Sequence, residues 1–165
     1  MHISQVIIDG YNLIGVQHRD LRRKREELIQ QLIAYKNRKG HDITVVFDGW
    51  RTGGHQQEQT SAGGIRVVYS RLGDRADDVI KKMMEPDGKE RIVITSDREI
   101  AEHAWSRGAV PVPSAQFMER LERNDLRPAG TSGDEGNGED EMRGRGNPRQ
   151  PSKKEKALIR VLRKL

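Results

Sequence analysis

Cysteine is absent from this chain of 165 residues, which excludes thiolate metal sites and thiol nucleophiles. No apolar run approaches the ~20 residues that a membrane span needs. The N-terminus leads straight into a strand-like segment and shows no signal-peptide pattern. Together these absences favour a cytoplasmic protein without a membrane partner.

Signatures of several enzyme classes are also missing. Neither Gly-x-x-x-x-Gly-Lys-Ser/Thr nor Gly-x-Gly-x-x-Gly occurs, so no nucleotide-cofactor loop is expected. A Gly-x-Ser-x-Gly nucleophile motif is absent, and the five histidines are scattered without metal-pair spacing. Carboxylates are therefore the main candidates for chemistry.

Three short apolar runs each lead to an aspartate. The runs 6–8, 44–47 and 92–95 deliver Asp9, Asp48 and Asp97. Such runs predict buried strands of a parallel sheet, and ligands of open α/β sheets bind outside the carboxyl ends of the strands. Carboxylates gathered there repel one another unless a cation lies among them, so we expect a divalent metal site. A lone Asp would be better explained as a turn or cap residue, and Asp48, which precedes Gly49, is the weakest of the three.

The order of the predicted elements is that of an α/β protein. Strands are expected at 3–8, 43–47, 65–69, 92–95 and 110–112, and helices at 19–38, 98–106 and 114–124. A further helix, capped by Asp74, is expected to run to about Met84. Residues 9–18 and 49–64 are expected to be loops. Alternating strands and helices predict a parallel sheet covered by helices on both faces.

The helix after Asp74 carries two acidic residues, Asp77 and Asp78, in its first turn. The favourable interaction with the helix dipole is a sufficient reason for acids there. The helix nevertheless begins at the edge where Asp9 is expected. Because neighbouring helical residues point ~100° apart, one of the pair should face the site and the other should be peripheral.

The segment 49–64 contains Trp50 and Arg51. These residues suit stacking on a base or holding a phosphate at the carboxyl edge of the sheet. An ordinary exposed loop, with Trp50 folded onto the core, fits the sequence equally well.

The last part of the chain differs in composition from the rest. Residues 127–151 are rich in glycine and nearly free of apolar side chains, which predicts a disordered linker between a domain at 1–126 and a helix at 152–165. This basic amphipathic helix carries the whole net charge of +5. It either packs on the domain or binds nucleic acid as a tethered element, and we favour the second alternative. Its cations are Lys153, Lys154, Lys156, Arg160, Arg163 and Lys164.

Four motifs give the chain a family resemblance. Asp-Gly-Tyr-Asn at 9–12, Val-Phe-Asp-Gly at 46–49, Arg-Ala-Asp-Asp at 75–78 and Thr-Ser-Asp at 95–97 resemble the NYN-domain branch of the PIN-like nucleases, and within it the YacP-like bacterial proteins. The likeness covers about residues 1–125, and the basic terminal helix also resembles the tail of those proteins. The glycine- and acid-rich linker has no counterpart that we can match.

The resemblance implies a PIN-like three-layer α/β sandwich with a parallel sheet of order 3-2-1-4-5. It implies a Mg²⁺ or Mn²⁺ cofactor and an endoribonuclease that cleaves single-stranded RNA, with mRNA on the ribosome as the partner. Carried onto this chain, Asp9, Asp77 and Asp97 are the acidic core and Asn12 is a supporting amide. Asp48, Asp78, Ser96 and Gly10 take secondary places.

Two other functions compete with a nuclease. One is a non-catalytic RNA- or ribosome-binding module that keeps a structural metal site. The other is a phosphatase-like hydrolase with Asp9 as nucleophile, which the presence of Tyr11 in place of a second aspartate disfavours.

Overall fold

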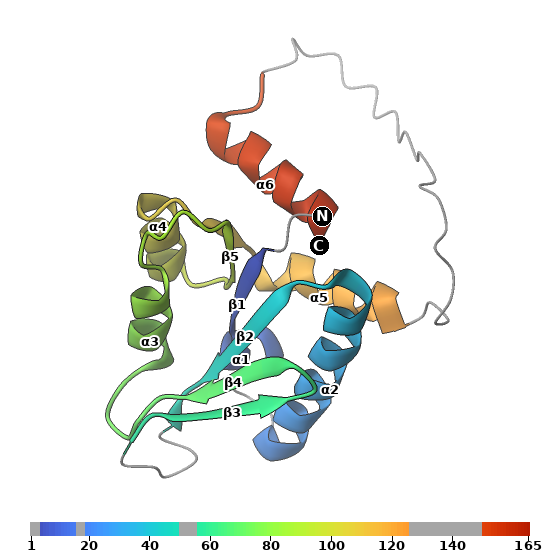
Figure 1. Ribbon diagram of the computed structural model, residues 1–165, viewed down its shortest axis with the longest axis vertical. Coiled ribbons are helices and arrows are strands. Elements are labelled where there is room, and N and C mark those ends of the chain that lie inside the picture. The colour runs from blue at the N-terminus through green and yellow to red at the C-terminus, as the bar shows by residue number, and fades with distance from the viewer. Residues whose placement is uncertain (1–3, 16–18, 50–55, 126–149) are drawn as a thin grey trace.

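The computed structural model describes residues 4–15, 19–49, 56–125 and 150–165. A six-stranded sheet of order β3-β4-β2-β1-β5-β6 lies at its centre (Figure 1). The parallel strands are β1 (Gln5–Asp9), β2 (Asp42–Phe47), β4 (Ile65–Tyr69), β5 (Arg91–Ile94) and β6 (Val110–Val112). The edge strand β3 (Glu58–Ala62) pairs with β4 in the antiparallel sense.

Helices cover both faces of the sheet and make it the middle of three layers (Figure 1). Side chains of α2 (Leu21–Lys39), α5 (Ser114–Asp125) and α6 (Lys153–Lys164) share one apolar cluster with one face of the sheet, and α1 (Gly10–Ile14) joins them there. The other face packs on α3 (Ala76–Met83) and α4 (Arg98–Ser106). The α/β sandwich is therefore confirmed. The five parallel strands have the predicted order, 3-2-1-4-5 being β4-β2-β1-β5-β6, and the sheet differs from the prediction by the additional antiparallel strand β3.

Two elements lie in segments that were expected to be loops. The strand β3 was missed because four of its five residues are exposed polar side chains, so no apolar alternation marks it. It forms because it can pair with β4 across the turn at Gly63 and Gly64, both of which have positive φ. The five-residue helix α1 is too short to show a helical period.

The cap expected for α3 is also corrected. Its N-cap residue is Arg75, without a side-chain cap bond, and the Asp74 carboxylate instead pairs with Arg71 at 2.7 Å. The backbone N–H of Ala76 donates to Asp48 Oδ1 at 2.6 Å. A carboxylate distant in sequence thus takes the place of the local cap.

The C-terminal helix α6 is packed on the domain, so the expectation of a free tethered helix is wrong. Val161 and Leu165 are buried in the same cluster as α2 and α5. Tyr35 Oη donates to the Leu165 carbonyl at 2.7 Å, and buried His41 bonds the Lys164 carbonyl through Nε2 at 3.0 Å. Because Ser4 N–H donates to His41 Nδ1, the Nε2 atom carries the proton. Because the domain offers an apolar surface here, the apolar face of α6 is more stable buried against it than exposed to water.

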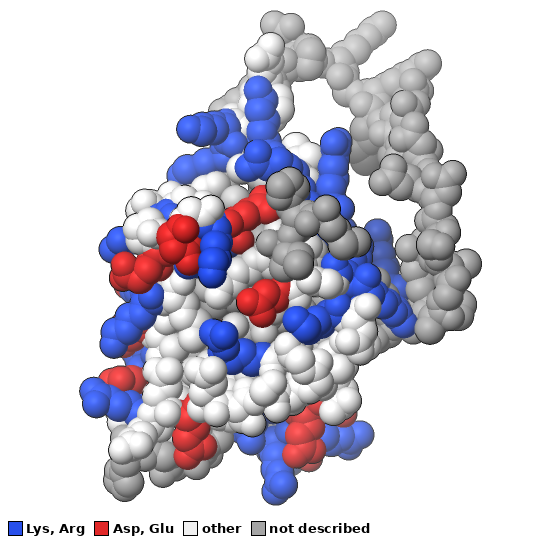
Figure 2. All heavy atoms as spheres, viewed as in Figure 1, with Lys and Arg blue, Asp and Glu red and all other residues white. Residues whose placement is uncertain are grey.

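On the face shown in Figure 2, Lys and Arg side chains gather over α6. Its cationic side chains thus remain at the surface while its apolar side is buried. Among the described helices, none is long and apolar enough to cross a membrane.

Candidate active site

Asp9 lies at the carboxyl end of the central strand β1 and is only 7% exposed. Burial, with the nearby carboxylates of Asp77 and Asp48, raises its pKa to about 7. Thr95 Oγ1 donates to Asp9 Oδ2 at 3.3 Å, and this bond together with the backbone N–H of Asn12 opposes the rise. Asp9 is thus a buried carboxyl group, close to other carboxylates, that changes charge near neutral pH.

Asp77 is the residue that links the four acids electrostatically. Its charge helps to raise the pKa of Asp9, and its own pKa is raised by burial and then by Asp97 and Asp48, against the lowering effect of Arg75. Arg75 pairs with Asp77 Oδ2 at 3.2 Å, with the arginine side chain 74% exposed and the aspartate side chain 16% exposed. Of the two neighbouring acids Asp77 and Asp78, Asp77 is therefore partly buried, whereas Asp78 is exposed.

Asp48 and Asp97 each use one oxygen to fix the start of a helix. Asp48 Oδ1 accepts the Ala76 N–H, which places Asp77 next to it at the beginning of α3. Asp97 is the N-cap of α4, and its Oδ1 accepts from the backbone N–H groups of Glu99 at 2.8 Å and Ile100 at 3.3 Å. Asp97 thus has the ordinary N-cap role considered from the sequence, whereas Asp48 bonds the start of a helix distant along the chain, and both residues also lie near Asp77.

Asn12 joins three separate parts of the chain at this edge. Its Oδ1 accepts from the Ser96 backbone N–H at 2.8 Å and from Ser114 Oγ at 2.7 Å. Ser96 Oγ in turn accepts the Ser114 N–H at 3.2 Å. The Asn12 carbonyl oxygen is therefore committed to protein donors, and the residue ties α1, the end of β5 and the start of α5 together.

Two glycines leave room for these contacts. A Cβ at Gly10 would lie 2.3 Å from Phe47 Cε1, so only glycine lets α1 start directly against that ring. A Cβ at Gly49 would lie 1.5 Å from the Ser70 carbonyl oxygen. Side chains at either position would push apart the segments that carry Asp9 and Asp48.

The donor set suits a hard divalent cation in its chemistry. Aspartate oxygens are the ligands that Mg²⁺ and Mn²⁺ prefer, and a cation would relieve the repulsion that raises the pKa of Asp9. Within the described ranges, however, no three Asp, Glu or His side chains form a ready-made metal cluster. One oxygen of Asp77 faces Arg75, so that ion pair would have to loosen for Asp77 to bind a metal.

Other predicted residues lie elsewhere. Trp50 and Arg51 are outside the described residues, as is most of the expected linker. Two cations of α6 have partners away from these aspartates: Lys164 pairs with Glu90 at 2.7 Å, and Lys154 lies 5.4 Å from the centre of the Trp105 ring.

Three residues that contact the site were not singled out from the sequence. Thr95 donates to Asp9 and accepts the Asp97 N–H at 3.0 Å, Ser114 supports Asn12, and Arg75 neutralises Asp77. Thr95 and Arg75 stand within the motifs quoted above, so motif position was an available signal. Ser114 has none, because its role depends on how α5 packs.

The sequence model of the YacP-like NYN domain matches residues 6–156, which is most of the chain. The chain belongs to the YacP-like NYN domain family. A relative from Bacillus subtilis (strain 168), named "Uncharacterized protein YacP", is 31% identical over 87 residues, which is 48% of this chain and 51% of that protein. The match thus spans about half the length of that relative.

Solved structures of similar fold come from the same organism. A crystal structure of Rae1 (YacP) from Bacillus subtilis matches with a TM-score of 0.61 at 24% identity over 76% of each chain. A crystal structure of a mutant of that protein matches equally well, with a TM-score of 0.61 at 22% identity over 74% of this chain and 77% of that one. At these identities the likeness shows the fold.

Proposed function

We propose that this protein is a divalent-metal-dependent endoribonuclease that cleaves single-stranded RNA. The observation that carries the proposal is the grouping of Asp9 with Asp77 and Asp48 at the carboxyl edge of the sheet, close enough that their charges raise the pKa of buried Asp9. Membership of the YacP-like NYN family supports a nuclease of this kind. A carboxylate group of this kind can hold a divalent cation, and such a cation would balance the charge that develops on a phosphodiester during hydrolysis.

In this proposal Asp9, Asp77 and Asp97 would hold the metal, and Asp48 and Asp78 would be secondary, since Asp48 bonds the start of α3 and Asp78 is exposed. A bound Mg²⁺ or Mn²⁺ supplies positive charge that orients the phosphate and stabilises the displacement. Asp9 must lose its proton to bind, and Thr95 and the Asn12 N–H hold the ionised carboxylate in place. Asp48 fixes the first residue of α3 and so the position of Asp77.

The finer statements about the substrate rest on the family resemblance alone. We propose mRNA in a ribosome-associated context as the natural substrate. Comparing cut sites on one mRNA, free and engaged by ribosomes, would test it; identical rates and sites under both conditions would contradict it.

The decisive experiment is incubation of the protein with a long single-stranded RNA in Mn²⁺ or EDTA, followed by mapping of the product ends. Internal cuts that require the metal and vanish in Asp9→Asn are expected. The matched control is Asp78→Asn, which removes a neighbouring but exposed carboxylate. If the wild type binds RNA without cutting it, the non-catalytic module is the correct alternative.

A further inference from the structure

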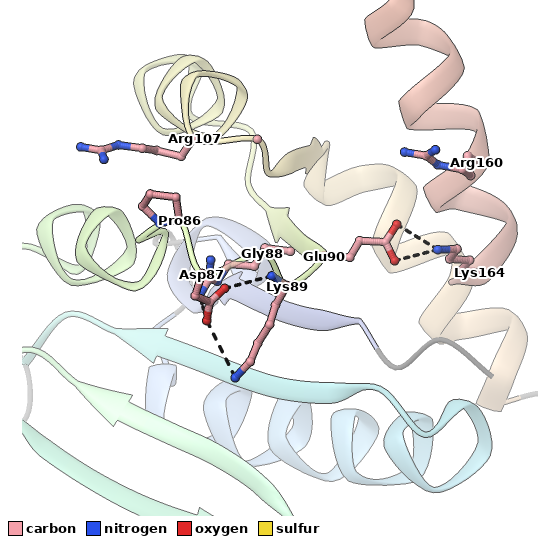
Figure 3. A pocket seen from close by; sticks show the side chains of 10 residues that line it. Pro86, Asp87, Gly88, Lys89, Glu90, Arg107, Arg160 and Lys164 are labelled. Carbon is pink, nitrogen blue, oxygen red and sulfur yellow. Dashed lines mark hydrogen bonds and ion pairs between the residues drawn. The ribbon is translucent and has the colours of Figure 1, made fainter.

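A cleft lies at the edge of the sheet opposite to Asp9 (Figure 3). It is bounded by the 86–91 segment before β5, by the end of α4 and by α6, and has a volume of about 580 Å³. We call it the amino-edge cleft, because β5 and β6 begin there. Its charged residues are Lys89, Arg91, Arg107, Arg160 and Lys164 against Asp87 and Glu90, which leaves an excess of positive charge.

The two acids of the cleft are already neutralised within the protein. Asp87 pairs with Arg91 at 2.7 Å and more loosely with Lys89 at 3.8 Å. Glu90 accepts two bonds from Lys164, at 2.7 and 2.9 Å, and one from Ser4 Oγ at 2.7 Å. These pairs connect the loop to β5 and to α6, so they have a structural role.

Arg107 and Arg160 are left over by this pairing. Their guanidinium groups form no hydrogen bond or ion pair within the described part of the chain, and both residues are exposed. Arg160 influences Glu90 only at longer range, where it helps to lower the pKa of that carboxyl group. Free guanidinium groups present forked donors that match phosphate oxygens.

The arrangement of the two arginines favours a chain of phosphates over one phosphate. Figure 3 shows Arg160 extending from α6 toward the 86–91 segment. Arg107 leaves the end of α4 on the other wall, and its side chain points away from α6. The two groups do not converge on one point. A polymer with a phosphate at every residue can meet both, whereas a single anion would meet one.

We propose that the amino-edge cleft is a second RNA-binding site, which holds backbone phosphates at Arg107 and Arg160 without contributing to cleavage. The choice of RNA rests on the proposed function, whereas the phosphate chemistry of the cleft does not. The docked helix α6 forms one wall, so its cations act from a fixed position and not as a free tail. An RNA contact at this edge would raise affinity for long substrates and leave the chemical step unchanged.

The test is a titration of labelled single-stranded RNA with the protein, in EDTA and at two salt concentrations, with fluorescence anisotropy as the measure of binding. For Arg107→Gln/Arg160→Gln we expect binding roughly tenfold weaker and a salt slope smaller by about one to two. Arg38→Gln/Arg66→Gln is the matched control, since it removes the same charge from exposed positions on α2 and β4. Arg107→Lys/Arg160→Lys should recover most of the affinity.

Equal weakening by the control pair, or no weakening by the cleft pair, would overturn the inference. So would displacement of the RNA by millimolar inorganic phosphate, because a single anion would then be the better ligand. Asp9→Asn should bind as the wild type does. If the cleft variant binds RNA more weakly but the wild type never cuts RNA, the proposed nuclease function is wrong and the second RNA-binding site stands. If the wild type cuts RNA but the cleft variant binds it unchanged, the nuclease function stands and the second site is wrong.

Discussion

At the scale of single residues, Asp9 combines poor solvation with like charges. A pKa raised to about 7 means that the folded protein holds this proton more tightly than the unfolded chain does. The contribution of Asp9 to stability is therefore complete below about pH 4 and is lost as the pH rises through about 7. At pH 8, where the group is ionised, this pKa rise corresponds to a cost of roughly 4 kcal/mol of folding free energy.

Asp9→Asn should consequently stabilise the metal-free protein at pH 8, by roughly 1–3 kcal/mol, and should add little at pH 5, where Asp9 is already protonated. The same change should abolish cleavage. Thermal melts at both pH values in EDTA measure the first effect. A gain of equal size at pH 5, or a loss at pH 8, would show that repulsion and burial do not govern this residue.

Asp77 and Asp78 are neighbours in sequence with different surroundings. Asp77 interacts with the other three acids of the site, whereas Asp78 is exposed. We expect Asp77→Asn to reduce cleavage at least tenfold more than Asp78→Asn does. Rates measured at saturating Mn²⁺ would check this, and the reverse order would move the site to the other side of α3.

The sequence predicted that these aspartates lie near one another, because strand ends and helix starts can be read from local pattern, and their mutual effects on pKa agree with this. It did not predict how each carboxylate is used. Asp48 could have been an ordinary turn residue, but it bonds the N–H of Ala76, which is 28 residues away along the chain. Such a bond depends on the order of strands in the sheet, and no local spacing encodes it.

At the scale of elements, the apolar period predicted α2 and the buried strands well, and it failed where burial was slight. β3 is held by pairing with β4 and has almost no apolar side chains. The helix α6 was visible in the sequence, yet its place was not, because a helix with an apolar side fits either a protein surface or another partner. The deciding groups, His41 and Tyr35, are more than a hundred residues distant in sequence.

Docking of α6 predicts that its buried face matters for stability. Val161→Ala should lower the free energy of unfolding by about 2 kcal/mol, since this side chain is fully buried. Ile159→Ala is the control on the same helix, with a side chain that is 45% exposed, and should cost much less. Urea titrations of both variants measure the difference. Equal and small effects would mean that α6 is not held on the domain in solution.

At the scale of the whole molecule, two edges of one sheet carry opposite charge. Acids gather at the carboxyl edge around Asp77, and two arginines that form no ion pair with any described residue lie at the amino edge beside α6. The acid edge is the one that opposes folding, because its charges are close together and partly buried. A ligand that neutralises this edge should therefore stabilise the entire fold.

Mg²⁺ or Mn²⁺ at millimolar concentration should raise the melting temperature at pH 7.5–8, because a ligand that binds only the folded state shifts the equilibrium by mass action. A metal present at about 100 times its dissociation constant would add about 2.7 kcal/mol. The rise should shrink at pH 5, where protons compete with the metal for Asp9. It should be nearly absent in Asp9→Asn, which is already relieved of the repulsion, and intact in Arg107→Gln/Arg160→Gln. A rise of equal size in Asp9→Asn would place the bound metal elsewhere on the protein, and an unchanged melting curve for the wild type would remove the metal site from the proposed mechanism.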